Sequence, residues 1–469
     1  MPLNKSKNLQ LYLVAALAPL CILIALVFTS PGQVDEVRYI DPGVNLSLGR
    51  GFNSSTWYEQ SPEGFWACST PAMAFLYAGW FKLVGFGLFQ SKFLSLFFHL
   101  AGAWLLTRWT SHRLSFSLIQ QTSVFIACLI MPVLAWAAVG CRLEVFALLF
   151  YAWFLYFTLN EKVVSKLHPF LFGALTPLFG LHFSGYFALA AAATFLYKRE
   201  KRYFYNGLIL AVGMAVGLLL LFIIYNHNDA INVFWEARAS HYTRTKMAWV
   251  PTGWRMFTVS PDLVLLALIA FGLLVRGVAK RSHNPPQVYR SAGLALTVFF
   301  LTPVLINKIG IYYVTYGWMV AVPMLLLLFE DTGRWMNENK RIAVASLVLV
   351  ALAIVYKTSL IVSSNLRLKT QHQSIARYIE IHTGKNEAIA GTLDIYYYLK
   401  PLRQNYFVQT QSPHWPKEIG NAINWAVNRR CQLDPPTLSS LSGDWEEVKC
   451  FPSATSKNSA DDYVIWHRK

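Results

Sequence analysis

The sequence predicts an all-α polytopic membrane protein that ends in a small α/β domain. Hydrophobic residues make up 55% of the 469 positions and charged residues only 14%, whereas about a quarter of a typical soluble domain is charged. The apolar residues gather in long runs, and a helix of about 20 such residues crosses a bilayer. The net charge of +17 lies largely in short loops, where basic residues set membrane orientation. It therefore does not indicate a nucleic-acid-binding protein.

Single apolar runs account for most of the predicted crossings. The first run is longer than a typical signal-peptide core and is followed by no small-x-small cleavage site, so we expect it to be retained as a helix. The candidate crossings of this kind are 9–30, 90–107, 118–139, 142–160, 205–226, 261–277, 291–306, 311–329 and 341–363.

Two further apolar segments are interpreted from their composition and from the basic loops. Residues 71–87 contain glycines and a lysine, and we expect an interfacial or re-entrant helix. Residues 168–197 would form one helix of about 45 Å, which is too long for an ordinary crossing. The basic clusters 161–166 and 197–202 share the cytoplasmic side only if the segment between them crosses and returns. The sequence therefore predicts two short helices with a break at 181–185.

This arrangement gives about eleven crossings, with the N-terminus in the cytoplasm and the C-terminal domain outside. The transmembrane domain covers 1–363, and its first extracytoplasmic loop is 31–89. Polar loops therefore gather on the outer face. The others on that face are 140–144, 182–185, 227–260 and 307–313.

Residues 364–469 predict an extracytoplasmic α/β domain. A helix stops near Gly384, and strands and a helix alternate up to the strand DDYVIW, 461–466. Cys431 and Cys450 lie in this domain, where an oxidising compartment permits a disulfide. Such a bond would contribute about 3 kcal/mol in the chain-entropy model. Two unpaired cysteines are the alternative.

Asp35, Glu36 and Arg38 follow the first apolar run within a few residues, in DEVRYIDPGVNLSLGRGF. Adjacent carboxylates point in different directions on a helix or strand, so they need not act as an acid/base pair. One can remove a proton from an acceptor, while the other binds a sugar hydroxyl, a cation or a positioning residue. The alternative is a solvated helix start after Pro31 and Gly32.

The order of features along 31–90 resembles that of the GT-C glycosyltransferases, in particular the protein O-mannosyltransferase and aminoarabinose transferase branch. The shared order is a first helix, DE, a tyrosine, a GRG-like turn and a proline-led aromatic segment ending in FG. The resemblance implies a GT-C-like fold, a polyprenyl-phosphate sugar donor, and carboxylates on the outer face with Asp35 as the base. The sequence departs from the family at EGFWACSTP (63–71), where many relatives have a basic residue before paired prolines. Here a single proline, Pro71, follows no lysine, so this segment lacks the basic residue expected to contact the phosphate.

Further candidates for substrate binding lie at the outer ends of other crossings. Arg142 and Glu144 are ionisable residues at a helix mouth, and such residues are usually paired or functional. A topology anchor, or an arginine on a lipid phosphate, is the alternative for them. His182 in FGLHFSG is either a phosphate contact or a hydrogen-bonded structural histidine. Both positions resemble residues of the GT-C family.

Lys308, Tyr312 and Tyr313 combine an ammonium group for a phosphate with hydroxyls that orient it, and they resemble a lysine–tyrosine pattern of the family. The alternative is an aromatic belt with a snorkelling lysine. The loop 227–256 is basic and aromatic, and it either neutralises a lipid-linked phosphate or binds lipid headgroups without specificity. Its basic residues are Arg238, Arg244, Lys246 and Arg255.

Together with the resemblance, these residues indicate an inverting glycosyltransferase with a polyprenyl-phosphate sugar donor. The acceptor is a lipid, a glycan or a protein at the outer face of a bacterial plasma (inner) membrane. A lipid-linked saccharide transporter or flippase is one alternative, although such proteins usually show repeated halves. A surface-polysaccharide polymerase or ligase is the other. No cofactor follows from the sequence, the need for a divalent metal stays open, and neither sugar nor acceptor is specified.

Overall fold

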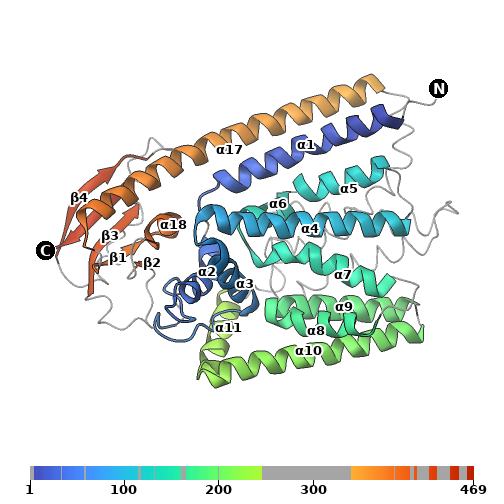
Figure 1. The fold of residues 1–469 in the computed structure, drawn as a ribbon, viewed down its shortest axis with the longest axis horizontal. Coiled ribbons are helices and arrows are strands. Elements are labelled where there is room, and N and C mark those ends of the chain that lie inside the picture. The colour runs from blue at the N-terminus through green and yellow to red at the C-terminus, as the bar shows by residue number, and fades with distance from the viewer. Residues whose placement is uncertain are drawn as a thin grey trace.

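Helices form most of the described part of the protein in this computed structural model, and a small sheet lies at one end (Figure 1). The predicted crossings 261–277, 291–306 and 311–329 lie outside the residues that the structure describes. These described residues are 5–32, 34–57, 60–114, 118–130, 132–159, 165–198, 200–245, 340–384, 386–401, 406–408, 422–429, 444–453 and 462–469.

Helices occur where the apolar runs of the N-terminal half predict them. α5 and α6 together cover the predicted crossing 118–139, and a 3-10 turn, η1 (Leu143–Phe146), leads into α7. The apolar and aromatic side chains of these helices form a continuous buried core, and burial of this surface is the main stabilising contribution to such a bundle. The helices are α1 (Lys5–Thr29), α4 (Leu88–Leu114), α5 (Leu118–Ile130), α6 (Pro132–Val139), α7 (Ala147–Leu159) and α10 (Lys201–His227).

The expected pair of short helices within 168–197 is present. α8 (Leu167–Phe179) ends at Gly180, and α9 (Leu181–Lys198) begins directly after it. The break therefore lies one residue before the predicted segment. The two helices then lie beside α10 in the bundle (Figure 1).

Glycines bring α8 and α10 into close contact. A Cβ atom on Gly213 would lie 2.2 Å from the carbonyl oxygen of Phe170, and one on Gly217 would lie 2.3 Å from that of Ala174. Small residues at a helix interface let two backbones approach closely. Any larger side chain at these positions would push α8 and α10 apart.

Large apolar side chains are exposed along α10. An apolar surface of this extent is typical of a membrane or protein interface. Among the described residues, α10 is the one helix with the length and apolar composition to cross a bilayer by itself. The total of about eleven crossings stays a prediction. The large apolar side chains on α10 that are at least 43% exposed are Phe204, Tyr205, Leu208, Val212, Leu218, Leu219, Leu220, Phe222 and Ile223.

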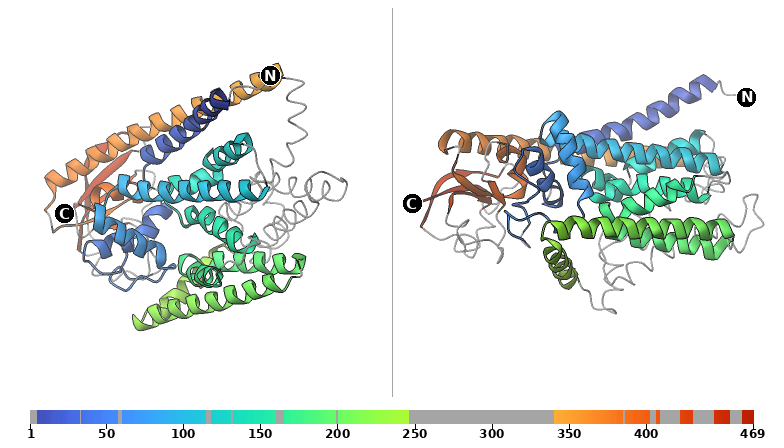
Figure 2. Two further views of the ribbon diagram at one scale, coloured as in Figure 1. Left: turned by 45° about the vertical axis from the view of Figure 1, so that its right-hand side comes forward. Right: turned by 60° about the horizontal axis from the view of Figure 1, so that its bottom comes forward.

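A single helix, α17 (Lys340–His382), joins the bundle to the C-terminal sheet (Figures 1 and 2). It packs along α1 at one end and against the sheet at the other. At 1.5 Å per residue, its 43 residues span about 65 Å. It continues without a break across the expected domain boundary at 363–364. The C-terminal domain is therefore a direct extension of a bundle helix.

The C-terminal domain contains a mixed five-stranded sheet within the described residues, with the strand order β2-β1-β3-β5-β4. β1 pairs in parallel with β2 and β3, whereas β5 pairs antiparallel with β3 and β4. The short helices η2 (Leu393–Ile395) and α18 (Tyr396–Leu399) connect β1 to β2. This is the predicted order of helix, strand, helix and strand. The strands are β1 (Ala388–Gly391), β2 (Tyr406–Val408), β3 (Ile423–Arg429), β4 (Trp445–Phe451) and β5 (Tyr463–Arg468).

Three short helices lie at the end of the bundle nearest the sheet (Figures 1 and 2). They are α2 (Val34–Ser47), α3 (Ala72–Val84) and α11 (Ile231–Thr245). α3 coincides with the predicted interfacial helix 71–87. A Cβ atom on Gly43 of α2 would lie 2.3 Å from the carbonyl oxygen of Ala74, so this glycine lets α2 pack directly on α3. The first loop is thus a helical layer that covers one end of the bundle.

Candidate active site

Helix α2 carries the adjacent carboxylates that the sequence singles out. It begins at Val34, directly before Asp35 and Glu36. One side of the helix is fixed in the core, where side chains such as Ile40 are fully buried. Asp35 lies about one helical turn before Arg38 in the sequence of α2, and its side chain lies outside the described residues. The candidate base is therefore on a helix that has one well-packed side.

Glu36 is fully buried and has a partner on each carboxylate oxygen. Its Oε2 lies 2.6 Å from Nζ of Lys92 in α4, and neither side chain has any exposed surface. Tyr397 of α18 donates its hydroxyl to Oε1 at 2.5 Å. A buried charge is stable only when it is paired and hydrogen-bonded, as it is here. The interpretation of this segment as a solvated helix start is therefore wrong for Glu36. Glu36 instead binds a cation, the side chain of Lys92, as one of the alternatives for the two carboxylates predicts.

Lys92 also connects Glu36 to the end of α6. Its Nζ donates to the carbonyl oxygen of Val139, the last residue of that helix. One turn further along α4, Ser95 donates to the carbonyl oxygen of Ala138 at 2.9 Å. The last carbonyl groups of a helix have no partner within it, so side chains of α4 satisfy those of α6. The first loop and the chain after α6 are thereby fixed to each other.

The loop after α6 contains a second buried ion pair. Nε of Arg142 lies 3.1 Å from Oε2 of Glu144, and the two side chains are 4% and 5% exposed. Cys141, just before them, has a φ of 43°, a left-handed backbone conformation that is uncommon for residues other than glycine. The chain turns there into η1. The predicted residues Arg142 and Glu144 are thus partners of each other in a loop that Lys92 joins to α2.

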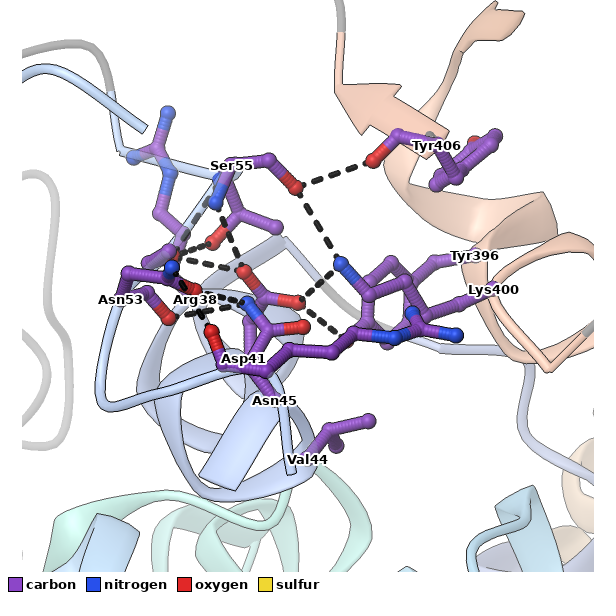
Figure 3. A network of polar contacts seen from close by, with 12 residues as sticks. Arg38, Asp41, Val44, Asn45, Asn53, Ser55, Tyr396, Lys400 and Tyr406 are labelled. Atoms are coloured by element: carbon purple, nitrogen blue, oxygen red, sulfur yellow. Dashed lines mark hydrogen bonds and ion pairs between the residues drawn. The ribbon is translucent and has the colours of Figure 1, made fainter. Parts of the chain in front are cut away.

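Asp41 of α2 is a buried carboxylate that joins the first loop to the C-terminal domain (Figure 3). The hydroxyl of Ser54 donates to Oδ2 at 2.8 Å, and the backbone N–H of Ser55 donates to it at 2.9 Å. Tyr396 donates its hydroxyl to Oδ1, which also lies 3.2 Å from Nζ of Lys400. The charge of Asp41 is therefore balanced by a lysine from the C-terminal domain.

Burial sets the protonation of the groups that α18 presents. It raises the pKa of Tyr396 and of Tyr397 well above the ordinary range, and the neighbouring Asp41 and Glu36 raise each further. Both phenols therefore remain protonated donors at physiological pH. Burial lowers the pKa of Lys400, and the charge of Asp41 opposes this effect. Two neutral phenols thus donate to two buried carboxylates of α2.

Residues 63–71, where the sequence departs from the family pattern, are held by side chains of α10 and α11. Arg238 of α11 donates to the carbonyl oxygen of Cys68 at 2.9 Å. Tyr225 of α10 donates its hydroxyl to the carbonyl oxygen of Ser69. A basic side chain thus lies at this segment, although it comes from another part of the chain.

The break between α8 and α9 also contacts the first loop. Thr70 donates its hydroxyl at 2.9 Å to the carbonyl oxygen of Phe179, the last residue of α8. His182 lies in the first turn of α9, half-buried, with its ring centroid 4.5 Å from that of Phe183. The predicted residue His182 is therefore at the end of the bundle that α2 covers.

Solved structures share this architecture, although no protein-family model and no curated protein sequence matches the chain. The structure of the aminoarabinose transferase ArnT from Cupriavidus metallidurans bound to undecaprenyl phosphate aligns with a TM-score of 0.68. The identity is 14%, over 99% of this chain and 98% of that one. The chain has the GT-C fold.

Two other structures with the GT-C fold align over most of the chain. ArnT from the same organism in the apo state has a TM-score of 0.52 and 12% identity, over 98% of both chains. The oligosaccharyltransferase of Archaeoglobus fulgidus in the apo form has a TM-score of 0.50 and 11% identity. That alignment covers 92% of this chain and 71% of the other. The expectation of a GT-C-like fold is confirmed.

At the end of the bundle that α2 covers, the GT-C fold gathers the predicted site residues that the structure describes. Arg38 is half-buried, and the central carbon of its guanidinium group lies 5.8 Å from the ring centroid of Trp57. The indole N–H of Trp57 donates to the carbonyl oxygen of Arg38 at 2.7 Å, which fixes the ring beside the cation. The residues gathered at this end are Glu36, Arg38, Arg142, Glu144 and His182.

The remaining predicted residues, or their expected partners, are described only in part or not at all. Arg244 is in α11, but its side chain is not described. Cys450 lies on β4, with its Sγ 3.8 Å from Oδ2 of Asp462. The roles of these residues and the Cys431–Cys450 disulfide stay predictions. The residues that lie wholly outside are Lys246, Arg255, Lys308, Tyr312, Tyr313 and Cys431.

Sequence reasoning missed the partners of the buried carboxylates. Lys92 could have been recognised from the sequence, because an ammonium group inside the apolar run 90–107 is costly to bury and requires a partner. The sequence contains no such signal for Tyr396, because its partner Asp41 is 355 positions away in the chain.

A metal site is not evident in the described part of the chain. Within it, no group of three or more His, Cys, Asp or Glu side chains is placed to hold an ion. The side chain of Asp35 is not among those described, so the need for a divalent metal stays open.

Proposed function

We propose that the chain is an inverting membrane glycosyltransferase that moves a sugar from a polyprenyl-phosphate donor to an acceptor. The observation that carries this proposal is that candidate site residues from distant segments lie at one end of a GT-C fold. The matching ArnT structure contains undecaprenyl phosphate, which belongs to the class of carrier that the family resemblance implies. This agreement supports a lipid-linked donor.

Asp35 is the proposed general base. In the proposed reaction it takes the proton of the acceptor hydroxyl as the acceptor oxygen bonds to the sugar and the bond to the carrier phosphate breaks. Glu36 is unsuited to this step because both of its carboxylate oxygens already have buried partners. We therefore assign Glu36 to holding α2 in place.

Basic side chains are proposed to stabilise the leaving phosphate, whose charge grows in the transition state. Lys308, with Tyr312 and Tyr313, is the candidate given by the sequence. Arg238 is a second candidate, because it supplies a cation beside 63–71. A guanidinium group has five N–H donors, so the bond to the backbone leaves donors for a phosphate.

The proposed location is the bacterial plasma membrane, with multiple crossings and with the site and the C-terminal domain outside the cytoplasm. The exposed apolar side chains of α10 suit contact with lipid tails. The basic cluster 197–202 lies between α9 and α10, at the end of both helices opposite the break at Gly180. Basic residues favour the cytoplasmic side, so the break belongs on the other side.

Cysteine labelling tests this orientation. Gly185 is exposed, and a Cβ atom there would contact nothing within 4 Å. In a background without other exposed thiols, Gly185→Cys should react with an impermeant maleimide added to intact cells. Lys201→Cys, at the opposite end of the helices, is the matched control and should react only after the membrane is opened. The reverse pattern would place the site in the cytoplasm.

A transfer assay tests the proposed activity directly. Purified protein in detergent should move label from a polyprenyl-phosphate sugar to an acceptor, with release of polyprenyl phosphate. A transporter or flippase would move the lipid-linked saccharide across a vesicle membrane and leave this bond intact. A polymerase or ligase would transfer saccharide chains rather than single sugars. Intact donor after incubation with lipid, glycan and protein acceptors would contradict the proposal.

A further inference from the structure

Three consecutive tyrosines of α18 have different environments. Tyr396 donates its hydroxyl to Asp41, and Tyr397 donates to Glu36 at 2.5 Å. The ring of Tyr398 instead lies edge-on to His372 of α17, with 5.9 Å between the ring centroids. Adjacent residues of one short helix thus contact two different carboxylates of α2.

The two contacts on α2 lie at separate points of the helix. Glu36 and Asp41 are five positions apart, which is about 7.5 Å along the axis and about 140° around it. One hydrogen bond restrains α2 at a single point, whereas two bonds at separate points also restrain its rotation and sliding. The ring of Phe86 stacks on Tyr397 at 5.6 Å, and this contact limits the movement of the phenol.

Lysines balance the two carboxylates from opposite parts of the fold. Lys92 pairs with one from α4, and Lys400 pairs with the other from the C-terminal domain. The hydroxyl of Ser55 donates to the carbonyl oxygen of Tyr406 at 3.0 Å, which extends the contact to β2 (Figure 3). The helix of the candidate base is therefore held from the bundle on one side and from the C-terminal domain on the other.

We propose that the C-terminal domain positions the catalytic helix through these tyrosines. Tyr397 acts through Glu36 and Tyr396 acts through Asp41, and together they hold α2 in the orientation in which Asp35 meets its acceptor. Both are positioning residues, because neither touches substrate in this scheme. The inference rests on the proposed role of Asp35, and it adds the C-terminal domain to the active unit of the protein.

Loss of one phenol hydroxyl should loosen α2 without unfolding the protein. Phenylalanine retains the ring packing and removes only the O–H donor, while each carboxylate keeps its lysine. Catalytic groups must be held within a fraction of an ångström, and small displacements lower turnover by up to about 100-fold. We therefore expect kcat to fall about 10- to 100-fold in Tyr397→Phe and in Tyr396→Phe. KM for the lipid donor should be unchanged, because neither hydroxyl contacts it.

The experiment uses the full-length protein in detergent, with Tyr398→Phe as the matched control. Hydrogen–deuterium exchange into 34–47 measures the mobility of α2 without reference to activity. Exchange there should increase in Tyr396→Phe and Tyr397→Phe and stay at the wild-type level in Tyr398→Phe. The same variants are then compared for kcat and KM in the transfer assay.

The two measurements separate this inference from the proposed function. Unchanged exchange in both test variants would overturn the inference, whether or not transfer is detected. Increased exchange with an unchanged kcat would also overturn it, because α2 would then move without consequence for the reaction. If the wild-type protein transfers no sugar, the proposed function and the inference that rests on it both fail. The exchange data then show only whether the two tyrosines restrict the mobility of α2. A parallel rise in exchange and fall in kcat, absent from the control, supports it.

Discussion

Asp35→Asn should lower the rate of sugar transfer at least about 100-fold, because a positioned general base typically contributes 10²- to 10⁴-fold. Asparagine keeps the size and hydrogen-bonding capacity of aspartate and cannot accept the proton at neutral pH. The change is measured as kcat in the transfer assay, with the expression level and donor binding of the variant compared with wild type. Both of these should be retained if Asp35 acts only in the chemical step.

Glu36→Gln provides the comparison for this prediction. It removes the charge that balances Lys92, so it should lower the yield of folded protein as well as the rate. If Glu36→Gln folds normally but is inactive while Asp35→Asn is active, then Glu36 is the base and Asp35 holds the helix. Near-normal transfer by both variants would show that the catalytic interpretation of this helix is wrong.

Lys92→Met should lower the free energy of unfolding by about 3–5 kcal/mol, the usual effect of removing one partner from a buried ion pair. Methionine fills a similar volume and leaves Glu36 as an uncompensated buried charge. The bond to Val139 at the end of α6 is lost as well. Thermal unfolding in detergent, followed by loss of the monodisperse species, measures the effect as a lower midpoint temperature.

Two variants test whether the ion pair is the cause. Lys82→Met removes an exposed lysine of α3 and should leave the midpoint near that of wild type. The double variant Glu36→Gln/Lys92→Met should recover part of the loss, since no unpaired charge remains. Equal midpoints for Lys92→Met and Lys82→Met would mean that the buried pair contributes little to stability.

The sequence predicted the helices best where one physical rule decides the outcome. Apolar runs located α1, α4 and α10, because crossing a bilayer requires length and hydrophobicity together. The charge of the flanking loops located the break at Gly180 to within one residue, because basic residues favour one side of the membrane. Such signals are local, so a single sequence contains them in full.

The contacts around the candidate site depend on long-range packing. Asp35 and Glu36 are adjacent and chemically alike, and only the fold shows Glu36 buried against Lys92. The pairing of Tyr397 with Glu36 joins positions 361 apart, for which no periodic pattern exists. The order of the strands in the sheet also depends on long-range pairing, so the sequence does not reveal it. Sequence reasoning therefore located the helix of the site, and the family resemblance implied Asp35 as the base, but neither revealed that Glu36 is held by a buried lysine.

The unbroken helix α17 ties the length of the chain to the angle of the C-terminal domain. One inserted residue would turn the sheet by about 100° and shift it by about 1.5 Å relative to the bundle. Seven residues, close to two turns, would nearly restore the angle but move the sheet about 10 Å away. Insertions and deletions, which exposed loops usually tolerate, would therefore displace α18 from α2. The number of residues between Lys340 and His382 therefore sets where the C-terminal domain lies relative to the bundle, and the site depends on it as much as on its side chains.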